Sequence, residues 1–182
     1  MPNEANYQDR ISEYDLDDLL ELWQSIEARD TPNWPPGQAF EYLVLRAFEL
    51  GGAEVRWPYR VDLEGEQIEQ IDGVVYTDGL ACLVESKDYT TSINVEPLAK
   101  MRNQLLRRPV STIGSIFSYQ GFTEPAVTLA RFMAPQTILL WNGTEIEFAL
   151  HNNYMCLGLV AKYRISVEQG LPNYNIGIEG IE

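Results

Sequence analysis

The sequence is poor in the residues that build metal clusters and disulfide frameworks. Its 182 residues include two cysteines, Cys82 and Cys156, and one histidine, His151. One chain therefore cannot assemble a zinc cluster of the usual kind. The two cysteines lie far apart in apolar stretches, so we expect two buried free thiols in a reducing cytoplasm. We assign His151 no role.

Long hydrophobic runs are missing as well. No stretch of eighteen or more apolar residues occurs, so the sequence predicts no membrane-spanning helix. The first residues are polar and acidic, and we expect no signal peptide. With 45% hydrophobic and 22% charged residues, the composition is that of a globular protein. We therefore expect a cytoplasmic protein with no membrane partner.

Positive charge is scarce, and the acidic excess is uneven. The net charge is −14; residues 1–71 carry five basic and sixteen acidic side chains, whereas residues 72–140 carry six of each. Phosphate contacts dominate the affinity of proteins for nucleic acids, so an acidic chain is expected to bind them weakly without help. Any basic surface is expected in the middle of the chain.

Turn and cap signals divide the chain into alternating helices and strands. Ser12 with Asp15 predicts a capped helix over 12–29, and Gly51-Gly52 ends a helix over 38–50. Thr144 with Glu147 predicts a further capping box. The other expected elements are strands over 53–61, 69–76, 80–87, 111–119 and 136–141, a helix over 96–108 with Pro97 in its first turn, and a helix over 123–133 with Thr123 as its cap. Residues 153–169 read as a helix or a strand, and their length and Gly170 favour the helix. Residues 173–182 read either as a short strand or as a frayed end.

This order predicts an α/β fold with a mixed central sheet. The stretches "QTILLW" and "IGSIFSY" are almost uniformly apolar, as expected of strands that helices cover on both faces. We expect an N-terminal helical extension and linker over 1–36, a core domain over 37–150, and a C-terminal extension over 151–182 that packs on the core.

The stretch "QIDGVVYTDGLACLVESKDY" places charges inside apolar strands. Asp78-Gly79 predicts a two-residue hairpin turn, which would set Asp72 opposite Glu85 with their Cβ atoms about 5 Å apart. Lys87 shares that face, and Gln70 would lie opposite it. Like charges placed opposite each other destabilise a sheet unless a proton or a cation lies between them.

A third carboxylate comes from the helix over 38–50. Glu41 falls at the flank of its apolar face, whereas Tyr42, Arg46 and Glu49 are expected on the other side. Carboxylates converging with a lysine are typical of a Mg²⁺ site, where the metal activates water and stabilises phosphate charge. The alternatives are a surface ion pair at the strand end and, for Glu41, an acid that merely reaches solvent.

Together these residues resemble the PD-(D/E)XK nuclease superfamily, most closely its Mrr-like restriction endonuclease branch. The acid at Asp72, the Glu-x-Lys at Glu85 and Lys87, the helix acid at Glu41 and an αβββαβ order carry the resemblance, which covers about residues 37–142. Ile71 stands where the motif name has proline. The likeness implies a restriction-endonuclease-like core that hydrolyses phosphodiester bonds in DNA.

The resemblance also implies roles for single residues. Mg²⁺, or Mn²⁺ as a substitute, would be held by Asp72, Glu85, the Ser86 carbonyl and Glu41, directly or through water. Lys87 would assist the nucleophile. A polar helix face at Lys100, Asn103, Gln104 and Arg107, flanked by Arg102 and Arg108, would contact the substrate; the same face could simply be solvated.

Two functions therefore stand after sequence analysis. The first is a Mg²⁺-dependent nuclease acting on DNA, in restriction, defence or repair, with RNA left open as a substrate. The second is a noncatalytic interaction module on the same fold, which the acidic charge suits. A protein partner or a homodimer is compatible with both functions.

Overall fold

The structure is a computed structural model that describes residues 4–177. The helices within this range are α1 (Glu4–Ser12), α2 (Leu16–Glu27), α3 (Gln38–Leu50), α4 (Glu96–Leu105), α5 (Glu124–Arg131), α6 (Gly143–His151) and α7 (Met155–Gln169). The strands are β1 (Glu54–Arg56), β2 (Tyr59–Leu63), β3 (Glu66–Ile71), β4 (Gly73–Thr77), β5 (Leu80–Lys87), β6 (Thr112–Ser118) and β7 (Ile138–Asn142).

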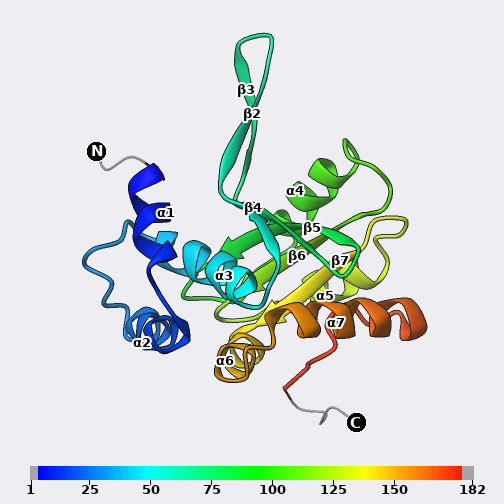
Figure 1. Ribbon diagram of the computed structural model, residues 1–182. Helices are drawn as coiled ribbons and strands as arrows, with labels where there is room; N and C mark the ends of the chain where they lie inside the picture. The colour runs from blue at the N-terminus through cyan, green and yellow to red at the C-terminus, as the bar shows by residue number, and fades with distance from the viewer. Residues whose placement is uncertain (1–3, 178–182) are drawn as a thin grey trace.

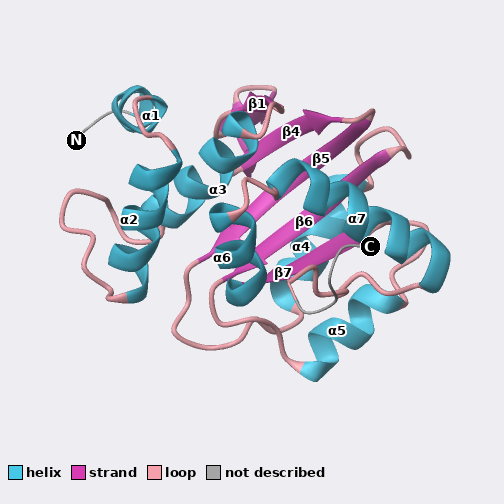
Figure 2. Cartoon of the chain, turned by 60° about the horizontal axis from the view of Figure 1, so that its bottom comes forward, coloured by secondary structure: helices cyan, strands magenta, loops and turns pink. Residues whose placement is uncertain are grey.

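Five of the strands form one mixed sheet in the order β1-β4-β5-β6-β7 (Figure 2). β4 is antiparallel to β1 and β5, whereas β5, β6 and β7 run parallel to one another. Parallel neighbours need crossover connections, and α4 and α5 provide them. The mixed α/β fold predicted from the sequence is thereby confirmed.

Helices cover both faces of this sheet, as predicted. α3, α6 and α7 bury one face around Phe48, Phe117 and Trp141, and α4 and α5 bury the other around Leu98 and Ile116. The β6 strand is buried from Ile113 to Ser118, which explains its nearly uniform apolar sequence.

The helix predicted over 12–29 corresponds to the shorter α2, and a helix that was not predicted, α1, precedes it. α1 ends at Ser12, and α2 begins after Asp15, whose carboxylate accepts the Asp18 N–H in a capping box. The prediction chose the wrong capping residue. Both helices contact α3, so Tyr42, expected on a polar side, is 1% exposed and lies against the rings of Tyr7, Trp34 and Trp57.

The strands predicted over 53–61 and 69–76 are each interrupted. β2 and β3 pair only with each other and form a hairpin that projects from the body of the protein (Figure 1). Its turn is Glu64-Gly65, where both residues have positive φ. The exposed side chains Leu63 and Ile68 lie on this hairpin.

Several later cap predictions hold and one fails. Pro97 lies in the first turn of α4, Thr123 caps α5 by accepting the Ala126 N–H, and Gly170 ends α7 in the left-handed conformation. The capping box of α6, however, pairs Asn142 with Glu145 and does not use Thr144 with Glu147. No strand forms over residues 171–177, and the rest of the predicted tail lies outside the described residues.

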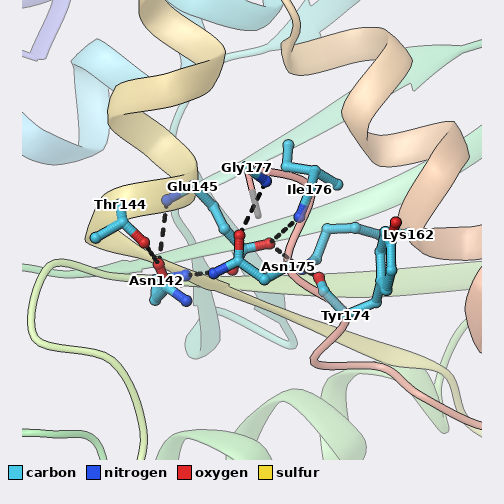
Figure 3. A network of polar contacts seen from close by, with 8 residues as sticks. All are labelled: Asn142, Thr144, Glu145, Lys162, Tyr174, Asn175, Ile176 and Gly177. Carbon is cyan, nitrogen blue, oxygen red and sulfur yellow. Dashed lines mark hydrogen bonds and ion pairs between the residues drawn. The ribbon is translucent and has the colours of Figure 1, made fainter. Parts of the chain in front are cut away.

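A buried ion pair joins α6, α7 and the C-terminal segment 171–177 (Figure 3). Lys162 and Glu145 are at most 1% exposed, with Nζ 2.5 Å from Oε1. Lys162 also donates to the Tyr174 carbonyl, and Glu145 accepts the backbone N–H groups of Asn142 and Ile176. The pair therefore fixes the segment against the sheet.

Among the helices that the structure describes, none is both long and apolar enough to cross a bilayer. Cys82 and Cys156 are buried and free, as predicted. Burial raises the pKa of the Cys82 thiol to about 12, although the Ser115 hydroxyl lowers it slightly. Both cysteines are therefore part of the packed interior.

Candidate active site

The β4–β5 hairpin has the register predicted from Asp78-Gly79. Both turn residues have positive φ, 49° at Asp78 and 77° at Gly79, as a type I′ turn requires. The ladder runs from Thr77↔Leu80 to Gly73↔Val84. Extending it by one pair would place Asp72 opposite Glu85, so the turn sets the spacing of the two acids.

Asp72 itself lies at the junction between the main sheet and the projecting hairpin. β3 ends at Ile71 and β4 begins at Gly73, so Asp72 belongs to neither strand. Its carboxylate accepts the Ser86 N–H at 3.0 Å. A Cβ on Gly73 would come within 2.5 Å of Leu45 Cδ2, so glycine lets α3 approach the sheet beside this acid.

One register prediction is wrong here. Gln70 pairs with Arg60 of β2, not with Lys87 of β5, because the chain leaves the main sheet before Asp72. The Gln70 carbonyl instead accepts the side-chain amide of Gln104 from α4.

Glu85 lies at the centre of the site and contacts two lysines. Its side chain is 1% exposed, and Oε1 lies 2.5 Å from Lys87 Nζ. Lys100 Nζ, from α4, lies 2.7 Å from Oε1 and 2.9 Å from Oε2. The strand lysine was expected beside Glu85; the contact with Lys100 was not.

The pKa values of Asp72 and Lys87 are both raised, for different reasons. Burial and the charge of Glu85 raise the pKa of Asp72 to about 6, although Lys87 and the Ser86 N–H oppose the rise. Burial alone would lower the pKa of Lys87, but Glu85 and Asp72 raise it overall. Lys87 therefore stays protonated, and Asp72 carries an unfavourable charge at neutral pH.

A cavity of about 470 Å³ opens over these groups. Its lining includes Glu41, Asp72, Ser86, Lys87 and Lys100. Glu41 lies in the first turn of α3 and is half-buried. The cavity thus brings together residues that the sequence separates by almost sixty positions.

The four predicted substrate contacts lie in different surroundings, three on α4 and Arg107 just after its end. Lys100 lines the cavity and Asn103 is exposed. Gln104 is 4% exposed and bonded to the Gln70 carbonyl. Arg107 pairs with Glu69 at the base of the β2–β3 hairpin.

Arg108 shares Glu69 with Arg107, with Nη2 2.8 Å from Oε2. Burial would raise the pKa of Glu69, but the hydrogen bonds from Arg108 and Arg107 lower it. These two arginines therefore attach the projecting hairpin to α4.

Sequence reasoning missed one further contributor. Arg29, which follows α2, pairs with Asp88 and donates to the Tyr89 carbonyl at 3.1 Å. Asp88 and Tyr89 line the cavity directly after Lys87. The N-terminal extension therefore helps to position the strand end, and only the tertiary fold reveals this contact.

The family of the chain follows from its sequence match. Residues 35–149 match the family Mrr_cat, described as restriction endonuclease. The chain belongs to this restriction endonuclease family. The matched range contains every proposed site residue, from Glu41 to Arg107. No curated protein matches the chain in sequence.

Several solved structures are similar to this restriction endonuclease family member. The small subunit R.BspD6I2 of the heterodimeric restriction endonuclease R.BspD6I superposes with a TM-score of 0.51 and 16% identity, over 81% of this chain and 89% of that chain. The protein of unknown function AF1548 gives a TM-score of 0.44 and 19% identity, over 56% of each chain. The restriction endonuclease MspJI, in complex with a 27-mer oligonucleotide, gives a TM-score of 0.44 and 16% identity, over 91% of this chain and 37% of that chain.

The donor atoms around the cavity suit a hard divalent cation. Within residues 4–177, no group of three or more Asp, Glu, His or Cys side chains is close enough to hold a metal by itself. Mg²⁺ needs fewer, because it retains waters beside one or two carboxylates. Gln38 and Ser86, two residues of the cavity lining, each have a buried side-chain oxygen without a hydrogen-bond partner in the described part of the chain. Unpaired polar atoms beside a cavity suit hydrogen bonds to water.

Proposed function

We propose that the chain is a Mg²⁺-dependent nuclease that hydrolyses phosphodiester bonds in DNA. The observation that carries the proposal is the adjacency of Asp72 and Glu85, both buried, with Lys87 bonded to Glu85 at the wall of an open cavity. Membership in the restriction endonuclease family supports the same reaction. Two neighbouring buried acids are unfavourable in a purely structural role.

Asp72 and Glu85 would hold the metal, with the Ser86 carbonyl and, directly or through water, Glu41. When bound, Mg²⁺ or Mn²⁺ lowers the pKa of a water and neutralises charge on the scissile phosphate. The Ser86 N–H orients the Asp72 carboxylate by donating to Oδ2 at 3.0 Å.

Lys87 orients the attacking water and stabilises negative charge as it develops on that water and on the phosphate. Its ammonium group is fixed by Glu85 and remains charged, since both acids raise its pKa. A lysine already charged and fixed in place needs no rearrangement during the reaction.

The acidic charge of the chain predicts weak unaided binding to DNA. Lys100 and Asn103 on α4 are proposed to contact phosphate, since one lines the cavity and the other is exposed. Arg107 is engaged with Glu69, so its proposed contact with phosphate would be shared with its contact to the hairpin. A protein partner or a second copy of the chain is proposed to supply additional affinity.

The projecting β2–β3 hairpin favours a second candidate function, an interaction module within a larger complex. Its side chains Leu63 and Ile68 are 60% and 43% exposed, and Asp62, Glu64 and Glu66 surround them. An exposed apolar pair among acids suits a protein partner more than a phosphate backbone. Cleavage of DNA by the isolated monomer would show that the chain is not solely an interaction module.

Cleavage by the pure protein tests the proposed function. We expect plasmid or single-stranded DNA to be cut in the presence of Mg²⁺ or Mn²⁺ and to remain intact with a chelator. Gel analysis of supercoiled, linear and single-stranded DNA, with RNA in parallel, measures this. Lys87→Met, which replaces the ammonium group with an uncharged, unbranched side chain of similar size, serves as the inactive control. Intact substrate with every nucleic acid and both metals would contradict the proposal.

A further inference from the structure

Glu85 is fully engaged by cations of the chain itself. Lys100 Nζ lies within 2.9 Å of both its carboxylate oxygens, and Lys87 Nζ lies 2.5 Å from Oε1. A metal ion bound to Glu85 would meet two ammonium groups at the same oxygens. Like charges a few ångströms apart repel strongly in a site of low dielectric constant. One of the lysines must therefore withdraw when a metal binds.

The two lysines differ in how easily they can withdraw. The Lys87 side chain is 19% exposed and is attracted by both Glu85 and Asp72 from within the strand. The Lys100 side chain is 46% exposed and reaches Glu85 from α4, across the cavity. A lysine has a flexible four-carbon stem, and its ammonium group binds phosphate as a point charge. Lys100 is the one that can move towards a ligand in the cavity.

We propose that Lys100 couples metal binding to nucleic-acid binding. Without a phosphate in the cavity, Lys100 neutralises Glu85 and opposes the metal. A phosphate that enters the cavity draws Lys100 away, and Glu85 then becomes available to the metal. The inference rests on the proposed function and adds a regulatory role to the same site.

The coupling has a definite thermodynamic signature. If nucleic acid raises the affinity for metal, metal must raise the affinity for nucleic acid by the same factor. Such a device suits a chain with a net charge of −14, because the site becomes competent only where a phosphate is already present. An ion pair that merely stabilises α4 would produce no linkage.

Titration of Mn²⁺ into the full chain tests the inference, with free Mn²⁺ followed by electron paramagnetic resonance. Each titration is made alone and with a phosphorothioate DNA duplex that resists cleavage. For the wild type, we expect the duplex to lower the Kd for Mn²⁺ about tenfold, within the usual range of coupling. For Lys100→Met without the duplex, we expect a Kd about tenfold lower than that of the wild type. Addition of the duplex should change the Kd of Lys100→Met for Mn²⁺ by less than about threefold.

Arg102→Met is the matched control. Arg102 is an exposed cation on the same helix and is absent from the contacts of Glu85, so its loss reports the general effect of one charge. Lys100→Gln repeats the test with a polar replacement, and thermal melting verifies folding of each variant. We expect Arg102→Met to retain the coupling of the wild type.

The outcomes separate this inference from the proposed function. Equal or weaker Mn²⁺ binding by both Lys100 variants, relative to the wild type, would overturn the coupling and leave the nuclease proposal standing. No Mn²⁺ bound by the wild type or by either variant, with or without the duplex, would overturn both. Tighter binding by the Lys100 variants, with the linkage lost, supports the coupling.

Discussion

Asp72→Asn is expected to abolish DNA cleavage and, at the same time, to stabilise the fold. The substitution removes one of two carboxylates proposed to hold the metal, and we expect cleavage to fall by at least about a thousandfold. The amide keeps an oxygen that can accept the Ser86 N–H, so the local backbone geometry is preserved. Loss of activity with a gain in stability distinguishes a functional acid from a structural one.

The gain in stability depends on pH in a definite direction. The pKa of Asp72 is raised from 3.8 to about 6 by burial and by Glu85. Below about pH 4 the carboxyl group is protonated in the folded and the unfolded protein, and its charge costs nothing. Between about pH 4 and pH 6 the unfolded chain has released this proton while the folded protein still holds it, so the stability of the wild type falls as the pH rises through this range. The wild type therefore loses roughly 3 kcal/mol relative to Asp72→Asn by pH 8.

Urea unfolding of both proteins at pH 5 and pH 8, in the presence of a chelator, measures this difference. Asp78→Asn is the matched control, because it makes the same chemical change at an exposed turn of the same hairpin and tolerates positive φ. We expect the control to cleave DNA normally and to show no stabilisation at pH 8. A destabilised Asp72→Asn protein at pH 8 would contradict the electrostatic account of the site.

Lys162→Met is expected to destabilise the protein by about 3–5 kcal/mol, the cost of leaving a buried carboxylate without its partner. Burial already raises the pKa of Glu145, and Lys162 opposes that rise. The substitution also removes the donor to the Tyr174 carbonyl, so segment 171–177 loses one of its attachments (Figure 3). Urea unfolding at pH 7 measures the loss.

Two further variants make this test specific. Arg164→Met removes a cation of α7 whose side chain is 72% exposed and pairs with Glu168, and we expect it to change stability by less than about 0.5 kcal/mol. The double variant Glu145→Gln, Lys162→Met removes both charges and should recover part of the loss. A loss below about 1 kcal/mol for Lys162→Met would contradict the predicted cost of separating this buried pair.

The candidate site was predictable where local sequence determines geometry. Asp78 and Gly79 both adopt positive φ, which most residue types do rarely. The resulting tight turn sets the register from Thr77↔Leu80 to Gly73↔Val84. The placement of Glu85 and Lys87 on one face follows from the alternation of a strand.

The projecting hairpin escaped prediction because its turn signal is weak. Glu64-Gly65 has the same positive-φ pair as Asp78-Gly79, but glutamate does not share the preference of aspartate and asparagine for that conformation. Consequently Asp72 was placed within a long strand, whereas it lies between two sheets. The junction is what brings its carboxylate to the Ser86 N–H.

Contacts between distant segments could not be read from the sequence. Lys100 reaches Glu85 only because α4 packs over β6, the neighbour of β5, and Arg29 reaches Asp88 only because the N-terminal helices pack against α3. Local patterns also placed Lys162 correctly on a helix but gave no sign that its charge is buried with Glu145. These pairs depend on the tertiary packing of whole elements.

The most direct test of the metal-dependent nuclease is a crystal structure of the wild type with Mn²⁺ and an uncleaved phosphorothioate duplex, recorded with anomalous scattering from manganese. We expect a peak bonded to carboxylate oxygens of both Asp72 and Glu85, at about 2.0–2.6 Å, the range for hard cations on oxygen. An ordered duplex in the cavity with no manganese at these acids, and with Glu85 still bonded to both lysines, would contradict the account.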